Sequence, residues 1–343
     1  MSPHDDPITA LRATISSAAR SVDGASSVEP KLERPPRPDF GDYSTNAAML
    51  LAPSLGEPPR PVAERLGAAL ADVLGEELER IDVAGPGFLN LFMTDAWFRR
   101  ALATMAAAGD RWGGGRADPV ERILIEFVSA NPTGPVTAAS GRHAAYGDSL
   151  ARLFEFAGHS PEREYYVNDA GSQIVRFGES IKARARGEEP PEDGYRGDYV
   201  TELAKKIPGA ADADPAELAR KGVELMVKDI AKTLERFRVR MDGFFSELSL
   251  YESGAVDRGL AEMEARGHVY SSEGAMWLRT TAFEDDKDRV LKRSSGEVTY
   301  LGSDIAYHQD KLRRGYDRVI NVWGPDHHGY IARMKGVWDA IGG

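Results

Sequence analysis

The chain's clearest chemical signal lies in residues 126–142, where an apolar strand leads through a turn rich in proline and glycine into a helix. Backbone N–H groups at the start of a helix have no partner within the helix and bind anions such as phosphate. Gly134, Ala139 and Gly141 lie in this turn and the first helical turn. We therefore expect them to contact the phosphates of a nucleotide.

Two hydroxyl side chains, Thr137 and Ser140, stand at the start of the same helix. They admit two interpretations. They are either a helix N-cap pair or neutral hydrogen-bond donors to a bound phosphate. His143 lies one turn further on, and it either contributes to the same site or is a surface or packing residue.

A second polar cluster follows a strand near the end of the chain and contains Gly324, Asp326, His327 and His328. Together with His308, these side chains raise the question of a metal site. Their spacing matches no established ligand set, so the sequence predicts no metal.

The elements around these residues indicate an α/β domain from residue 116 to 343. Strand 122–129, helix 140–157 and strand 162–167 are typical of a doubly wound, Rossmann-like parallel sheet. Residues from about 170 to 299 are expected to form an α+β insertion. It holds helices near 171–185, 198–206, 215–239 and 254–266, and short strands near 275–280. The α/β pattern then resumes with helix 304–314, strand 318–322 and helix 328–340.

Residues 1–112 are expected to form a separate, smaller α+β domain, bounded by three consecutive glycines at 113–115. Apolar residues at helical spacing predict helices over 8–22 and 61–78, and a further helix begins at 46. Short strands are predicted over 81–83 and 88–92, with a Gly-Pro-Gly turn between them.

Composition narrows the functional class. The chain has 343 residues, 42% hydrophobic and 28% charged, which is ordinary for a globular protein. A net charge of −11 argues against a broad basic face for nucleic acid. The absence of cysteine excludes disulfides and thiolate metal sites. The N-terminus has no apolar signal segment and no run is long enough for a membrane helix, so a cytoplasmic protein with no membrane association is expected.

The motif Asn-Pro-Thr-Gly-Pro at 131–135 closely resembles the signature of the arginyl-tRNA synthetase family, a family of class I aminoacyl-tRNA synthetases. Further blocks resemble the same family in the same order, which makes the resemblance specific and extends it over nearly the whole chain. They lie at 41–46, 58–60, 84–90, 163–174, 242–247, 274–278, 286–290, 299–308 and 321–330.

The resemblance implies a pocket for arginine. It places Tyr300 and Asp304 at the guanidinium, and Ser129 and Asn131 at the α-amino and carboxylate end, while Glu126 adds negative charge. The alternative for Asp304 is a helix N-cap.

For the nucleotide, the resemblance implies ATP with Mg²⁺ and no tightly bound cofactor. It places the segment that contains Gly324, Asp326, His327 and His328 against the adenosine.

Two departures from the family pattern bear on activity. Thr137 and Ser140 stand where the family has the two histidines of its ATP-binding "HIGH" motif, so this motif is degenerate. The sequence also stops before the family's "KMSKS" loop and anticodon-binding domain. We therefore expect lost or strongly impaired aminoacylation with a retained arginine and ATP pocket. The alternatives are an active arginine–tRNA ligase fragment, a repurposed arginine-activating ligase, and a non-catalytic tRNA-binding module.

Two partners follow from these expectations. The resemblance implies tRNA for domain 1–112, because the family's N-terminal domain contacts the tRNA elbow. An open sheet edge near 318–322 predicts a homodimer or another partner there, since unpaired strand edges favour pairing.

Overall fold

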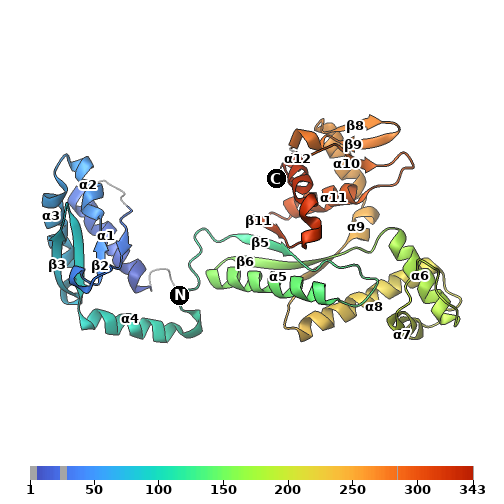
Figure 1. The fold of residues 1–343 in the computed structure, drawn as a ribbon, viewed down its shortest axis with the longest axis horizontal. Coiled ribbons are helices and arrows are strands. Elements are labelled where there is room, and N and C mark those ends of the chain that lie inside the picture. The colour runs from blue at the N-terminus through green and yellow to red at the C-terminus, as the bar shows by residue number, and fades with distance from the viewer. Residues whose placement is uncertain (1–5, 24–28, 284, 343) are drawn as a thin grey trace. The chain divides into compact units, whose positions relative to one another are not determined.

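The computed structural model describes residues 6–23, 29–283 and 285–342, except for the side chain of Asp326. Its contacts divide the chain into two compact units. The first covers Met1–Asp118 with Phe156–Gly158, and the second covers Pro119–Glu155 with His159–Gly343. Figure 1 shows both units as mixtures of helices and strands.

The first unit is built on an antiparallel sheet with the strand order β1-β2-β4-β3. Apolar side chains of its helices and strands form one core, which includes Ile15, Leu66 and Leu91. The strands are β1 (Leu32–Glu33), β2 (Tyr43–Thr45), β3 (Leu78–Ala84) and β4 (Phe88–Met93). The helices are α1 (Pro7–Asp23), α2 (Ala47–Leu55), α3 (Pro59–Leu74) and α4 (Asp95–Ala108), with 3-10 turns η2 (Pro38–Phe40), η3 (Gly75–Glu77) and η4 (Gly109–Arg111).

One expectation for this unit needs correction, and one helix of the unit was not predicted. The helix predicted over 61–78 ends at Leu74, because Gly75 has φ +50° and the chain turns before β3 begins at Leu78. Helix α4 was not predicted; Thr94 caps it by accepting a hydrogen bond from the Trp97 N–H.

The second unit contains the predicted parallel sheet, with the strand order β11-β5-β6-β7. Its strands are β5 (Arg122–Glu126), β6 (Ser160–Val167), β7 (Gly243–Ser246) and β11 (Arg318–Asn321). The sheet confirms the expected α/β class. However, β7 lies inside the range 170–299 that was expected to be an insertion, so that range is interrupted by a strand of the central sheet.

Helix α5 (Ala138–Ala157) runs along this sheet (Figure 1) and approaches it closely through one glycine. A Cβ atom at Gly147 would lie 2.2 Å from the ring of Phe127, which is fully buried. Helices α6 (Ser172–Ala185), α7 (Asp198–Lys206) and α8 (Pro215–Arg236) confirm three predicted helices, although α8 ends before the predicted residue 239. Helix α6 packs against both α7 and α8.

A separate apolar core joins the remaining helices of this unit to a small antiparallel sheet of order β10-β9-β8. The strands are β8 (Val269–Ser272), β9 (Ala275–Leu278) and β10 (Arg289–Lys292). The helices are α9 (Glu247–Glu252), α10 (Ala255–Ala265), α11 (Tyr300–Arg313) and α12 (Ile331–Ile341), with 3-10 turns η5 (Thr280–Phe283) and η6 (Pro325–Tyr330).

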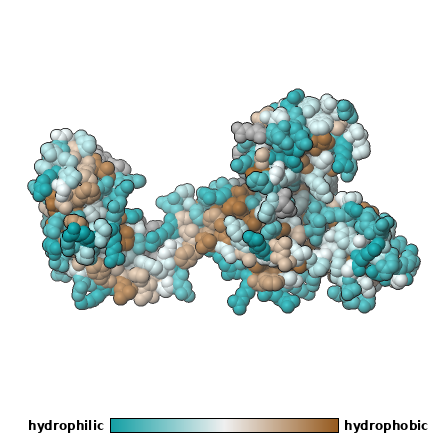
Figure 2. All heavy atoms as spheres, in the orientation of Figure 1, coloured by the Kyte–Doolittle hydropathy of each residue, from teal (hydrophilic) through white to brown (hydrophobic). Residues whose placement is uncertain are grey.

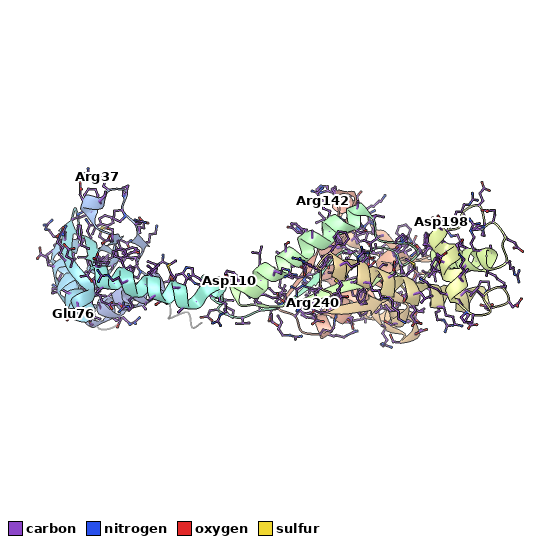
Figure 3. All side chains as sticks on the ribbon, turned by 90° about the horizontal axis from the view of Figure 1, so that it is seen from below. Arg37, Glu76, Asp110, Arg142, Asp198 and Arg240 are labelled. Carbon is purple, nitrogen blue, oxygen red and sulfur yellow. The ribbon has the colours of Figure 1, made fainter. Side chains whose placement is uncertain are left out.

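Hydrophilic side chains cover much of the face shown in Figure 2. Arg142, near the start of α5, is among the exposed cations of the second unit (Figure 3). Among the described residues, we find no helix with the length and apolar character needed to cross a membrane. β11 is the edge strand of the described sheet, and a partner there stays a prediction.

Candidate functional site

A cavity of about 370 Å³ lies at the carboxyl ends of β5 and β6. This is the edge where parallel α/β sheets usually bind their ligands. The start of α9, the first turns of α11 and the segment after β11 complete its wall. The predicted site residues that line it are Glu126, Ser129, His143, Tyr300, Asp304, His308, Gly324 and His327.

Asp304 lies in the second turn of α11, because the helix begins at Tyr300. The alternative of a helix N-cap is therefore wrong for Asp304. Its carboxylate accepts a hydrogen bond from the Tyr330 hydroxyl. Burial raises the pKa of Asp304 to about 7, with further contributions from the nearby carboxylates of Glu126 and Glu247.

Glu126 has a cationic partner inside the protein. Its Oε2 lies 2.6 Å from Nζ of Lys311, a fully buried side chain of α11. Nζ of Lys311 also donates to Oδ1 of Asn321 at 2.9 Å and lies 4.0 Å from the centre of the Tyr307 ring. The negative charge of Glu126 is thus compensated without any ligand.

Glu247 was not predicted, although it lines the cavity and is 3% exposed. Burial raises the pKa of its carboxyl group, against hydrogen bonds from Ser303 and Tyr166. Its Oε2 is buried and has no hydrogen-bond partner among the described residues. The sequence signal that could have indicated Glu247 is strand β7, because Glu247 follows this strand directly and Ser246 caps α9. This strand was not recognised, because it lies within the range expected to be an insertion.

The backbone is strained where β5 ends and the cavity begins. Val128 and Ser129 have φ values of +71° and +41°, a region that β-branched residues rarely adopt. This turn brings Oγ of Ser129 to 2.9 Å from Oε1 of Glu126, to which it donates. Oγ of Ser129 also accepts a hydrogen bond from the Tyr166 N–H at 3.2 Å. The predicted strand 122–129 is therefore three residues too long, and its end forms part of the site.

The degenerate motif positions lie at the start of α5 and do not line the cavity. The Thr137 hydroxyl accepts from the Ser140 N–H at 3.3 Å, and the two hydroxyl oxygens are 3.1 Å apart. This geometry matches the N-cap interpretation for Thr137. The other predicted site residues outside the cavity lining are Asn131, Gly134, Ala139, Gly141 and His328.

His308 is a neutral structural residue. Burial, together with the charge of Lys311, lowers its pKa to about 3. Its Nδ1 lies 2.8 Å from the Asp304 carbonyl oxygen, and its Nε2 lies 3.2 Å from Nδ2 of Asn321. The described residues contain no group of three potential metal ligands, and the side chain of Asp326 lies outside them.

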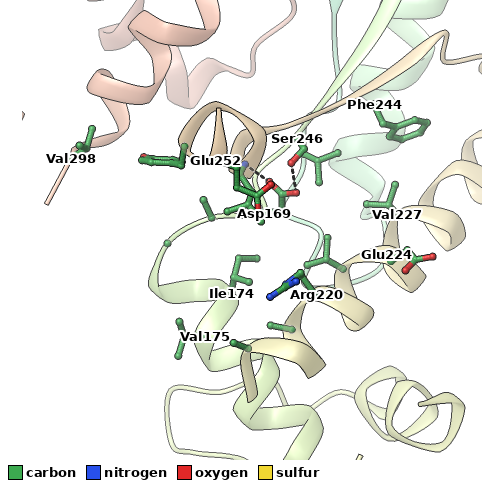
Figure 4. A pocket seen from close by; sticks show the side chains of 18 of the residues that line it. Asp169, Ile174, Val175, Arg220, Glu224, Val227, Phe244, Ser246, Glu252 and Val298 are labelled. Carbon is green, nitrogen blue, oxygen red and sulfur yellow. Dashed lines mark hydrogen bonds between the residues drawn. The ribbon is translucent and has the colours of Figure 1, made fainter. Parts of the chain in front are cut away.

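A larger cavity of about 830 Å³ lies between α6, α8 and the end of β7 (Figure 4). It is lined mainly by apolar side chains and by none of the residues predicted to bind arginine or nucleotide. Asp169 lines it, but its carboxylate accepts from the Ser246 hydroxyl at 2.6 Å and the Leu248 N–H at 2.8 Å. Asp169 therefore fixes the start of α9.

Comparison with known proteins gives one consistent result. Residues 9–93 match the family described as "Arginyl tRNA synthetase N terminal domain". An arginine–tRNA ligase of Kineococcus radiotolerans is 44% identical over 97% of this chain and 61% of its own length. One of Bacillus subtilis is 44% identical over 91% of this chain and 58% of its own. The chain thus spans about 60% of these relatives.

Solved structures agree with this result. A Campylobacter jejuni chain assigned as an arginyl-tRNA synthetase is 38% identical, with a TM-score of 0.65 over 69% of this chain and 55% of its own. The Thermus thermophilus arginyl-tRNA synthetase is 22% identical, with a TM-score of 0.59 over 97% of this chain and 63% of its own, and shows the likeness in fold alone.

Proposed function

The chain belongs to the arginyl-tRNA synthetase family, and we propose that its cavity binds arginine. The observation that carries the proposal is that acidic side chains outnumber their basic partners among the described residues of the cavity. The carboxylates of Glu126, Glu247 and Asp304 line one cavity, and among them Glu126 is the one paired with a described lysine or arginine. A guanidinium ion would supply the missing positive charge and up to five N–H donors in a planar fork.

In the proposed complex, the guanidinium contacts Asp304 and the orphaned oxygen of Glu247. Tyr300, whose side chain lines the cavity while the residue stays 69% exposed, covers it from the solvent side. Ser129 would hold the α-amino and carboxylate end together with Asn131, which lies outside the lining but beside Asn168, a lining residue. Asn131 is held in turn by the Asn168 side-chain amide, which donates to it at 3.3 Å.

ATP with Mg²⁺ is the proposed second substrate. Gly324, His327 and His328, together with Asp326, would contact the adenosine. The phosphates would face Gly134, Ala139 and Gly141 at the start of α5. A cytoplasmic location also stays a prediction.

Adenylate formation is expected to be strongly impaired. Charge develops on the phosphate oxygens during the reaction, and each missing donor typically raises the barrier by about 2.7–4 kcal/mol. Thr137 and Ser140 carry no charge where the family resemblance implies two histidines, and the Thr137 hydroxyl already caps α5.

Calorimetry with arginine, citrulline and ATP tests the proposal. Citrulline has nearly the shape of arginine but no positive charge, so we expect arginine to bind and citrulline to bind at least about 100-fold more weakly. Equal affinity for the two amino acids would contradict the acidic pocket. Arginine-dependent exchange of pyrophosphate into ATP tests impairment separately, since fast exchange would contradict the impairment and leave arginine binding intact.

Arginine affinity should depend on pH. The pKa of Asp304 is raised to about 7, so this carboxyl group holds a proton below that pH and must release it when a guanidinium binds. Affinity should therefore rise about tenfold between about pH 6 and pH 8. Titrations in two buffers of different ionisation enthalpy should show close to one proton released at about pH 6. An affinity that does not change over this range would contradict the prediction.

A second candidate function is tRNA binding by the first unit, favoured by the match of residues 9–93 to the synthetase N-terminal domain. Arg37 (labelled in Figure 3) stacks over the exposed ring of Phe40, with its guanidinium carbon 5.0 Å from the ring centre, an arrangement suited to unpaired bases. Retention of tRNA that weakens steeply with salt, and weakens further in Phe40→Ala, would support this function. Retention of tRNA that changes neither with salt nor in Phe40→Ala would contradict this function.

A further inference from the structure

We infer that Tyr330 is a positioning residue that couples a ligand on the segment Gly324–Tyr330 to the orientation of Asp304. The inference rests on the proposed function, because it assigns the two ends of Tyr330 to the nucleotide and arginine sides of one cavity. It concerns regulation of that cavity, namely how occupancy of one side changes affinity at the other.

Tyr330 is placed between the two sides. It is the last residue of η6, and its hydroxyl donates to Oδ2 of Asp304 on α11. Its ring meets the ring of Trp323 edge-on at 5.7 Å, and Trp323 stacks on His327 at 5.7 Å. Arg333 lies 4.8 Å from the centre of the Tyr330 ring. Trp323, which directly precedes the segment, therefore forms a continuous aromatic layer with His327 and Tyr330 of the segment, and this layer ends at the Asp304 carboxylate.

The hydrogen bond has a defined direction. Burial raises the pKa of Tyr330, so the hydroxyl keeps its proton and remains a donor. The titratable groups that face Asp304, besides Tyr330, are Glu126 from β5, Tyr166 from β6, Glu247 and Tyr251 from α9, and His308 and Lys311 from its own helix. The two glutamates disfavour a charged Asp304, whereas Lys311 and the Tyr330 hydroxyl favour it. Tyr330 thus both orients the carboxylate and lowers its pKa.

Coupling follows from this arrangement. A nucleotide that packs on the segment fixes Trp323 and His327, and through them the ring of Tyr330. Arginine then meets a carboxylate that is already oriented, so less ordering is needed on binding. By thermodynamic reciprocity, arginine must raise nucleotide affinity by the same factor.

Tyr330→Phe is the test, since it removes one oxygen and keeps the ring. We expect arginine affinity to fall about fivefold to twentyfold and ATP affinity alone to stay within about twofold. The factor by which each ligand improves the other should fall to about one. Tyr316→Phe is the matched control, because it also removes a hydroxyl bonded to a carboxylate, that of Glu162 at 2.6 Å, outside the cavity. It should leave all three quantities unchanged.

A second measurement uses the chain without ligands. The Asp304 carboxyl carbon, assigned by its loss in Asp304→Asn, is followed by NMR as pH is varied. Tyr330→Phe should raise its pKa. Wild-type arginine affinity in Tyr330→Phe, unchanged coupling, or an unchanged Asp304 titration would each overturn the inference. Failure of the wild-type chain to bind arginine would instead contradict the proposed function, while the ligand-free titration would still decide the link between Tyr330 and Asp304.

Discussion

Asp304→Asn is expected to lower arginine affinity by at least about 100-fold. The substitution keeps the size of the side chain but removes the charge that the guanidinium needs. Truncating one partner of a buried, hydrogen-bonded charge pair costs about 2–5 kcal/mol, and each 1.4 kcal/mol is a factor of ten in affinity. Calorimetry at about pH 8, where Asp304 is ionised, gives the clearest comparison with wild type.

The matched control for this variant is Asp310→Asn. Asp310 lies on the same helix, forms an ion pair with Arg314 at 3.0 Å and does not line the cavity. It should bind arginine like wild type.

The thermal stability of Asp304→Asn separates an effect on binding from an effect on folding. Because a raised carboxyl pKa makes the fold less stable as pH rises towards 7, Asp304→Asn should unfold at a higher temperature than wild type at about pH 8. Wild-type affinity in Asp304→Asn would exclude Asp304 from the binding site.

Lys311→Met is expected to destabilise the second unit by about 3–5 kcal/mol, the usual effect of removing one partner of a buried ion pair. Methionine fills most of the space but leaves the Glu126 carboxylate buried without its cation, and leaves Oδ1 of Asn321 without its donor. Urea unfolding followed by tryptophan fluorescence measures the change, because Trp323 and Trp338 pack against this core.

Two further variants test the electrostatic reason. The double variant Glu126→Gln with Lys311→Met removes both charges, so it should regain most of the lost stability. Lys228→Met, in a solvent-exposed pair with Glu224, controls for the substitution itself and should unfold close to wild type. A double variant as unstable as Lys311→Met would show that packing, rather than charge, determines the effect.

Much of the second unit follows from local sequence patterns. Strand β5 is short and strongly apolar, and strand β6 is flanked by turn residues. Helices α6, α7 and α8 repeat apolar residues at helical spacing. These patterns depend on neighbours within a few residues, so the sequence predicts them closely. The four residues of β7 carry too little periodicity to be distinguished from a loop.

The site itself was predicted less completely, because its contacts join distant parts of the chain. Tyr300, Asp304, Ser129 and Glu126 came from family resemblance, and they line the cavity. Resemblance alone did not indicate that Lys311 neutralises Glu126, or that Tyr330 bonds to Asp304. Such pairs are set by tertiary packing, which no local pattern encodes.

The bond between Lys311 on α11 and Glu126 on β5 joins positions 185 residues apart. Strand β11, which follows α11, pairs directly with β5 in the sheet. The cavity therefore does not exist until β11 has docked beside β5. Closing so long a loop is intrinsically slow, because the chain loses conformational entropy before the long-range contacts that stabilise the closed form are made. Ligand capture during refolding would accordingly report the last stage of assembly, and its time course would lag behind the appearance of helical signal.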